Sequence, residues 1–123
     1  MKKYLALSFF IMLFVGLGHL ISRQEAYYGT YWYADILLHV TAGVAMGVFW
    51  LALAGKPAKK TDYAAIVLFA VFGSYLWELW EFSGLKVIPD KLIYKPTLPD
   101  SLGDIVAGMG GGAIVALFLK LRK

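Results

Sequence analysis

Cysteine is absent from this chain of 123 residues, and charged side chains make up only 16% of it. Without cysteine, the protein has neither a disulfide framework nor a thiolate ligand for a metal. Hydrophobic residues reach 60% and the mean hydropathy is +0.67, which is too apolar for a soluble domain of this size. The sequence therefore predicts a membrane protein.

Four apolar stretches account for most of the sequence. Each is close to the roughly 20 residues that a helix needs to cross a bilayer core. Backbone groups in lipid must be satisfied within their own segment, which favours helices over separate strands. We therefore expect an all-α, polytopic bundle of four transmembrane helices, forming a single domain over residues 1–123. The predicted helices are Tyr4–Ile21, Tyr33–Ala54, Tyr63–Phe82 and Leu102–Leu119.

The distribution of basic residues predicts the topology. Eight lysines and arginines lie at the termini and in the second loop, against four in the first and third loops. The positive-inside rule then predicts that both termini are cytoplasmic. No small-x-small cleavage site follows the first stretch, so we expect it to be retained as a helix. The net charge of +4 needs no nucleic-acid partner; the expected partners are membrane lipids, with a homo-oligomer or larger membrane complex left open.

Ionisable residues gather at one predicted depth, in the outer third of the bundle. Within a membrane helix such residues are costly and are functional candidates by default. Asp35 and His39 lie four residues apart, on one ridge of the second helix with Gly43 and Gly47. Membrane helices approach closely along glycine ridges, so we expect these polar side chains on a packing face. The residues at this depth are His19, Asp35, His39, Glu78, Glu81, Asp100 and Asp104.

The fourth helix repeats the pattern of the second. The segments "DILLHVTAGVAMG" and "DSLGDIVAGMGGG" align without a gap, and the alignment can be extended to the preceding helices. This predicts two repeated helical hairpins related by a pseudo-twofold axis along the membrane normal. The paired polar positions are Asp35 with Asp100, His39 with Asp104, and His19 with Glu78.

Some of these residues also have a purely structural interpretation. Asp35 could cap the second helix, and Asp100 with Ser101 could cap the fourth. Glu78 and Glu81 fit this interpretation less well, because the helix dipole disfavours a carboxylate near a helix C-terminus. Several carboxylates at one depth would also repel one another unless they took up protons, paired with cations or bound a metal.

Histidines together with carboxylates spaced three and four residues apart are the ligands from which helical bundles build carboxylate metal sites. The pattern predicts a divalent metal ion (Zn, Mn, Fe or Mg). A protonated or lysine-paired network of the same residues is the alternative. The candidate ligands are Asp35, His39, Glu78, Asp100, Asp104 and His19.

Three segments, "DILLH", "WELWE" and "PDSLGDIVAG", resemble the motifs of the YjdF-like bacterial inner-membrane proteins and, more loosely, of the VanZ-like proteins. The resemblance covers the second to fourth helices. The chain departs from the pattern in its short loop "YKPTLPD" before Asp100. The resemblance implies the fold, the shared polar site and a location in the cell (inner) membrane of a bacterium or archaeon, and it implies no particular reaction.

Three functions are compatible with the sequence. One is a metal-dependent hydrolase acting on a lipid or envelope substrate at the outer leaflet, with Glu81 as the catalytic base. A non-catalytic metal-binding or structural membrane subunit is the second. The third, an ion or proton conduit, is disfavoured because the inner halves of the helices contain no ionisable group. The residues expected to hold a substrate headgroup are Arg23, Lys86, Lys91 and Lys95.

Overall fold

The computed structural model describes residues 1–24, 31–55, 60–83 and 97–122. All four of its helices are long and apolar enough to cross a membrane, which confirms the predicted all-α bundle. Every helix includes the stretch predicted for it and extends up to four residues further. The helices are α1 (Lys2–Gln24), α3 (Trp32–Ala54), α4 (Lys60–Ser83) and α5 (Leu98–Leu121).

The largest difference from the predicted bounds is at the start of α5, which begins four residues earlier than expected. Thr97 is its N-cap, and the Thr97 hydroxyl accepts a hydrogen bond from the backbone N–H of Asp100. Pro99 fits the first turn because its missing N–H would have no helical partner there. The cap that the sequence assigned to Asp100 and Ser101 is therefore supplied by Thr97.

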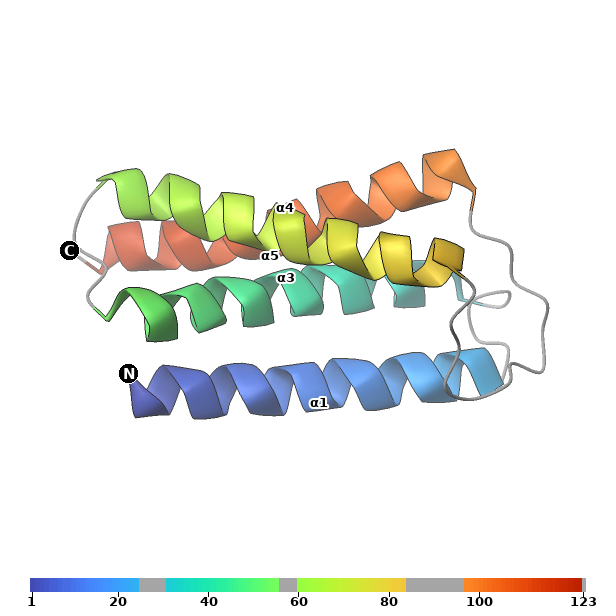
Figure 1. Ribbon diagram of the computed structural model, residues 1–123, viewed down its shortest axis with the longest axis horizontal. Helices are drawn as coiled ribbons and strands as arrows, with labels where there is room; N and C mark the ends of the chain where they lie inside the picture. The colour runs from blue at the N-terminus through green and yellow to red at the C-terminus, as the bar shows by residue number, and fades with distance from the viewer. Residues whose placement is uncertain (25–30, 56–59, 84–96, 123) are drawn as a thin grey trace.

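The helix α3 is central to the bundle and packs against α1, α4 and α5 (Figure 1). The helices α4 and α5 also pack against each other. The N-terminal and C-terminal ends of the chain lie at the same end of the bundle, as four spans require (Figure 1). We call this the terminal end and the opposite one the distal end.

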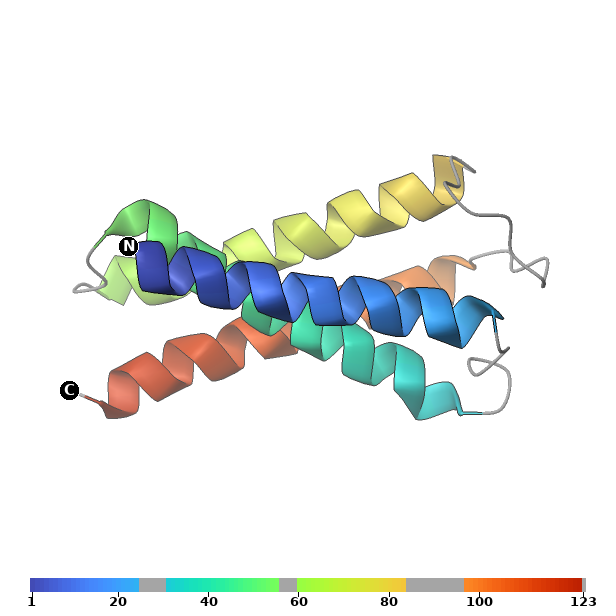
Figure 2. The same ribbon diagram turned by 90° about the horizontal axis from the view of Figure 1, so that it is seen from below.

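Glycine allows α3 and α5 to cross in close contact near their middles (Figure 2). A Cβ atom on Gly43 would collide with the carbonyl oxygen of Gly108, and one on Gly111 would collide with that of Val40. The helix backbones can touch only because these side chains are absent. The predicted ridges do lie on packing faces, because their buried members are His39, Gly43 and Gly47 in α3, and Asp104, Gly108 and Gly112 in α5.

The crossing agrees in part with the predicted repeat. Gly43 and Gly108 occupy equivalent positions in the two aligned segments, and they meet each other, as a pseudo-twofold relation requires. The other two helices, α1 and α4, do not follow the pseudo-twofold symmetry. In the described part of the chain, the backbone of α4 lies close to both α3 and α5, whereas that of α1 lies close to α3 alone.

The terminal half of the bundle is closed by an apolar core, formed by Val48, Leu51, Ile66, Val115 and Ala116. These side chains come from α3, α4 and α5. The predicted polar site residues lie in the distal half of the same helices, except His19, which lies in the distal half of α1. Packing of the core therefore separates the polar region from the terminal end of the bundle.

Candidate metal centre

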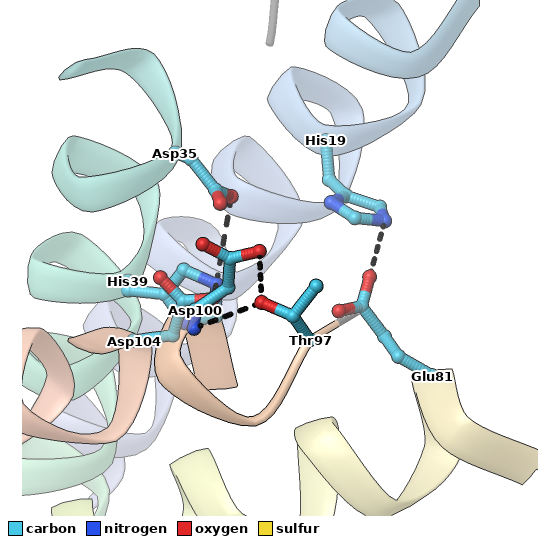
Figure 3. Close-up of polar contacts among 7 residues, drawn as sticks. All are labelled: His19, Asp35, His39, Glu81, Thr97, Asp100 and Asp104. Atoms are coloured by element: carbon cyan, nitrogen blue, oxygen red, sulfur yellow. Dashed lines mark hydrogen bonds and ion pairs between the residues drawn. The ribbon is translucent and has the colours of Figure 1, made fainter. Parts of the chain in front are cut away.

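Three ionisable side chains lie close together where α3 and α5 separate, on the distal side of their crossing. The Nε2 atom of His39 lies 3.6 Å from Asp35 Oδ1 and 3.6 Å from Asp104 Oδ2 (Figure 3). One ligand atom from each of the three residues lies within 4.8 Å of the others. We call this group the Asp–His–Asp cluster. His39 is one turn from Gly43, and Asp104 is one turn from Gly108, so the glycine contact brings the two side chains together.

The spacing of the Asp–His–Asp cluster suits a bound cation. A distance of 3.6 Å exceeds the 2.7–3.2 Å usual for an N–H···O hydrogen bond. Two ligands placed about 2.0–2.1 Å from a tetrahedral ion lie about 3.3–3.4 Å apart. The two separations from His39 are closer to this second value, and all three ligand atoms lie within 4.8 Å of one another.

Burial differs across the cluster. The side chains of His39 and Asp104 are 9% and 10% exposed, whereas the Asp35 side chain is 27% exposed. The N-cap of α3 is Tyr31, which makes no capping hydrogen bond with its side chain. Asp35 therefore does not cap α3 and lies instead against His39, one turn further along the helix.

Glu78 lies beside the cluster in α4. It is only 4% exposed, and neither carboxylate oxygen has a hydrogen-bond partner among the described residues. Glu78 interacts electrostatically with both His39 and Asp104. A buried carboxylate with no partner is costly unless a proton or a cation neutralises it. Among the described residues, however, only Asp35, His39 and Asp104 have ligand atoms within 4.8 Å of one another, so Glu78 is a buried acidic neighbour of the cluster and not one of its members.

His19 and Glu81 form a second pair at the distal end, between α1 and α4 (Figure 3). The distance from His19 Nε2 to Glu81 Oε1 is 3.7 Å. The His19 ring also packs edge-on against Trp77, with ring centroids 4.8 Å apart. The structure therefore places these two predicted site residues in a separate pair. Trp77 was not singled out from the sequence, although it stands next to Glu78 in "WELWE".

Asp100 is the predicted ligand that lies furthest out. It is exposed, and the Thr97 hydroxyl donates a hydrogen bond to its Oδ2 atom at 2.6 Å (Figure 3). Sequence analysis missed Thr97, although a threonine three residues before an acid is a capping signal. The predicted headgroup residues lie outside the described part, namely Lys86, Lys91 and Lys95, together with the side chain of Arg23.

Two hollows adjoin the cluster. A cavity of ≈ 50 Å³ lies between α1, α3 and α4 and is lined in part by His19, Asp35 and His39. A larger cleft of ≈ 590 Å³ lies between α3 and α5 and is lined in part by Asp35, Asp100 and Asp104. Asp35 borders both hollows. The cluster can therefore be reached through the cleft, while its other side faces the interior of the bundle.

The whole chain agrees with one family of proteins. A family model described as "Predicted membrane protein (DUF2238)" matches residues 2–123. The chain belongs to this family. The match agrees with the resemblance to YjdF-like proteins only at this coarse level, and nothing supports the looser resemblance to VanZ-like proteins. No curated protein and no solved structure matches the chain. The family establishes a membrane protein, so the chemistry of the site depends on its geometry.

Proposed function

We propose that this membrane protein binds a divalent metal ion through Asp35, His39 and Asp104. One observation carries the proposal: two carboxylate oxygens lie 3.6 Å from the same imidazole nitrogen, a spacing suited to ligands of one ion. Imidazole suits zinc, iron, copper and nickel, and carboxylates suit magnesium, manganese and calcium, so the mixed ligand set is compatible with the predicted Zn, Mn, Fe or Mg and does not select among them.

The charge of the region supports the same proposal. Asp35, Asp104 and Glu78 lie around a single histidine inside membrane-spanning helices. Among the described residues, His39 is the positive partner in both ion pairs of the cluster. One imidazole offsets at most one carboxylate, whereas a divalent cation would offset two. Binding would therefore stabilise the fold, by about 2.7 kcal/mol at a free metal concentration of 100 times Kd.

Hydrolysis is the reaction that such a site would best support. A bound divalent ion polarises a phosphoryl or acyl oxygen and activates water. The cleft between α3 and α5 gives a substrate a route to Asp35 and Asp104. Glu78 would accept the proton of the attacking water, since it is buried beside the cluster and has no hydrogen-bond partner among the described residues. Glu81, the base expected from the sequence, is engaged with His19 and is placed less favourably.

A metal-stabilised structural subunit is the alternative, and the same site would serve it without a reaction. An ion or proton conduit is supported less well. The apolar core around Leu51 and Ile66 occupies the terminal half of the bundle, where a conduit would need polar groups. We therefore propose a site that is closed toward the terminal end and lies in the distal half of the bundle, which the positive-inside rule assigns to the side away from the cytoplasm.

Metal analysis of the purified protein tests the proposal. The wild-type protein should contain a divalent metal in near-equal proportion to the chain. Asp35→Asn, His39→Ala and Asp104→Asn should each lose it and melt at a lower temperature. Asp62→Asn is the matched control, because it also removes an acid but lies in the first turn of α4, at the terminal end. Wild-type metal content and melting temperature in all three cluster variants would overturn the proposal.

A further inference from the structure

The cleft between α3 and α5 is lined by two kinds of side chain, acidic and apolar. Along it, the carboxylates run from exposed Asp100 to buried Asp104. Its other lining includes large apolar side chains that face away from the bundle: Trp32 is 74% exposed, Ile36 is 44% exposed and Val106 is 59% exposed. All three belong to candidate membrane spans. The cleft therefore opens sideways toward lipid, and both of its walls carry acidic as well as apolar side chains.

An amphiphilic molecule matches this lining better than a soluble one. A ligand site usually combines apolar walls with a few well-placed polar groups. Here the apolar residues lie where acyl chains would pass, and the polar groups lie at the cluster. A membrane lipid could bring its head to Asp35 and Asp104 while its chains stayed in the bilayer.

The charge of the cleft lining determines which lipid headgroup it would favour. No basic side chain lies among the described residues that line it, while Asp35, Asp100 and Asp104 all do. A divalent ion at the cluster would offset two of these carboxylates and attract a phosphate. Asp100 would remain as an exposed acid, held in place by the Thr97 hydroxyl at 2.6 Å. It would favour a cation and repel an anionic head.

We infer that this cleft receives the head of a membrane lipid in which a phosphate is joined to an ammonium group. The phosphate would lie at the metal ion between Asp35 and Asp104, and the ammonium would lie near Asp100. Asp100 and Asp104 are one helical turn apart, about 6 Å along α5, which a two-carbon link between phosphate and ammonium can span. This inference rests on the proposed metal site, because the carboxylates alone would repel a phosphate.

One glycine allows the cleft to be blocked. A Cβ atom added to Gly103 would meet nothing within 4 Å, although Gly103 lines the cleft. Gly103→Leu should therefore fill the cleft without disturbing the packing of the helices. Gly110→Leu is the matched control, because a Cβ there also meets nothing within 4 Å, and Gly110 is in the same helix but not in the cleft lining.

Native mass spectrometry of the detergent-purified, metal-loaded protein would measure binding. The probes are two lipids with identical acyl chains, one with a phosphoethanolamine head and one with a phosphoglycerol head. The wild type and Gly110→Leu should bind the first about tenfold more tightly than the second, a difference of about 1.4 kcal/mol. Gly103→Leu should lose this binding and keep its metal. Asp100→Asn should keep binding but lose most of the preference between heads.

Each other outcome would contradict a defined step. Equal lipid binding by Gly103→Leu and wild type, with equal metal content, would overturn the cleft as the lipid site and leave the metal site standing. Equal affinity of the wild type for both heads would overturn the role of Asp100. Competition by soluble glycerophosphoethanolamine at the same concentration as the lipid would show that the ligand is not a lipid. A wild type without metal would remove the proposed function and this inference together.

Discussion

Replacing Gly43 with alanine should separate α3 from α5 and open the Asp–His–Asp cluster. A Cβ at this position would lie 2.8 Å from the carbonyl carbon of Gly108 and 2.9 Å from its Cα atom, besides colliding with the carbonyl oxygen. Ordinary contacts of a Cβ atom begin near 3.4 Å. The obstacle is backbone and not a flexible side chain, so the helices themselves must move apart.

The expected cost of Gly43→Ala can be bounded from this geometry. Adding a methyl group to a well-packed interior typically costs about 1–3 kcal/mol. Because helix backbone must move here, we expect the upper part of that range. The shift should also lengthen the distances from His39 to Asp104 and weaken metal binding by tenfold for each 1.4 kcal/mol of ligand interaction lost.

Unfolding in mixed micelles and metal titration of the same samples would measure both effects. Gly110→Ala is the control, because its new methyl group would meet nothing within 4 Å, and it should be as stable as the wild type or slightly more so. Gly111→Ala should resemble Gly43→Ala, since its Cβ would lie 2.7 Å from the Val44 nitrogen. If Gly43→Ala unfolded and bound metal like Gly110→Ala, the close crossing would not be what assembles the cluster.

Three further outcomes follow from the fold. His19→Ala should retain the metal, because His19 lies in a separate pair with Glu81. It should lose about 0.5–1.5 kcal/mol of stability, because the ring contact with Trp77 is removed. Loss of the metal in this variant would show that His19 belongs to the site. Ser8→Ala should cost about 0.6 kcal/mol in unfolding measurements by removing the hydrogen bond to the Ala45 carbonyl, and no change would show that this bond does not hold α1. In intact cells, an impermeant thiol reagent should label Leu98→Cys and miss Leu121→Cys; the reverse pattern would invert the topology.

The helices could be predicted from the sequence because the physics of the bilayer leaves few alternatives. Apolar stretches of near-membrane length must form helices, and the four predicted stretches all lie within observed helices. The start of α5 was missed because Thr97 caps a turn that includes Pro99 and Asp100, and the hydropathy pattern does not register such a turn.

The candidate site was predictable in part. The four-residue spacing of Asp35, His39 and Gly43 identified the packing face of α3, and the matching spacing in α5 identified its partner. The sequence could not predict which residues would form the Asp–His–Asp cluster and which would form the His19–Glu81 pair. The predicted depth and repeat placed His19 with His39, but in the structure His19 in α1 lies beside Glu81 in α4.

Glu78 is a second residue whose depth, but not whose environment, could be predicted from the sequence. Its depth in the membrane was clear from the sequence, and the structure adds that both of its oxygens are buried without a hydrogen-bond partner in the described part. Such a group is expected only where a proton or a cation neutralises it. The residue types of the site can be read from the sequence, whereas helix packing decides which of them lie close together.

X-ray absorption spectroscopy of the metal-loaded protein tests the central claim most directly, because it reports the ligands of the ion. We expect nitrogen and oxygen donors at about 2.0–2.2 Å with the scattering pattern of an imidazole ring. That pattern should disappear in His39→Ala and persist in His19→Ala. A spectrum that kept its imidazole signal in His39→Ala, or that lacked one in the wild type, would contradict a metal centre at Asp35, His39 and Asp104.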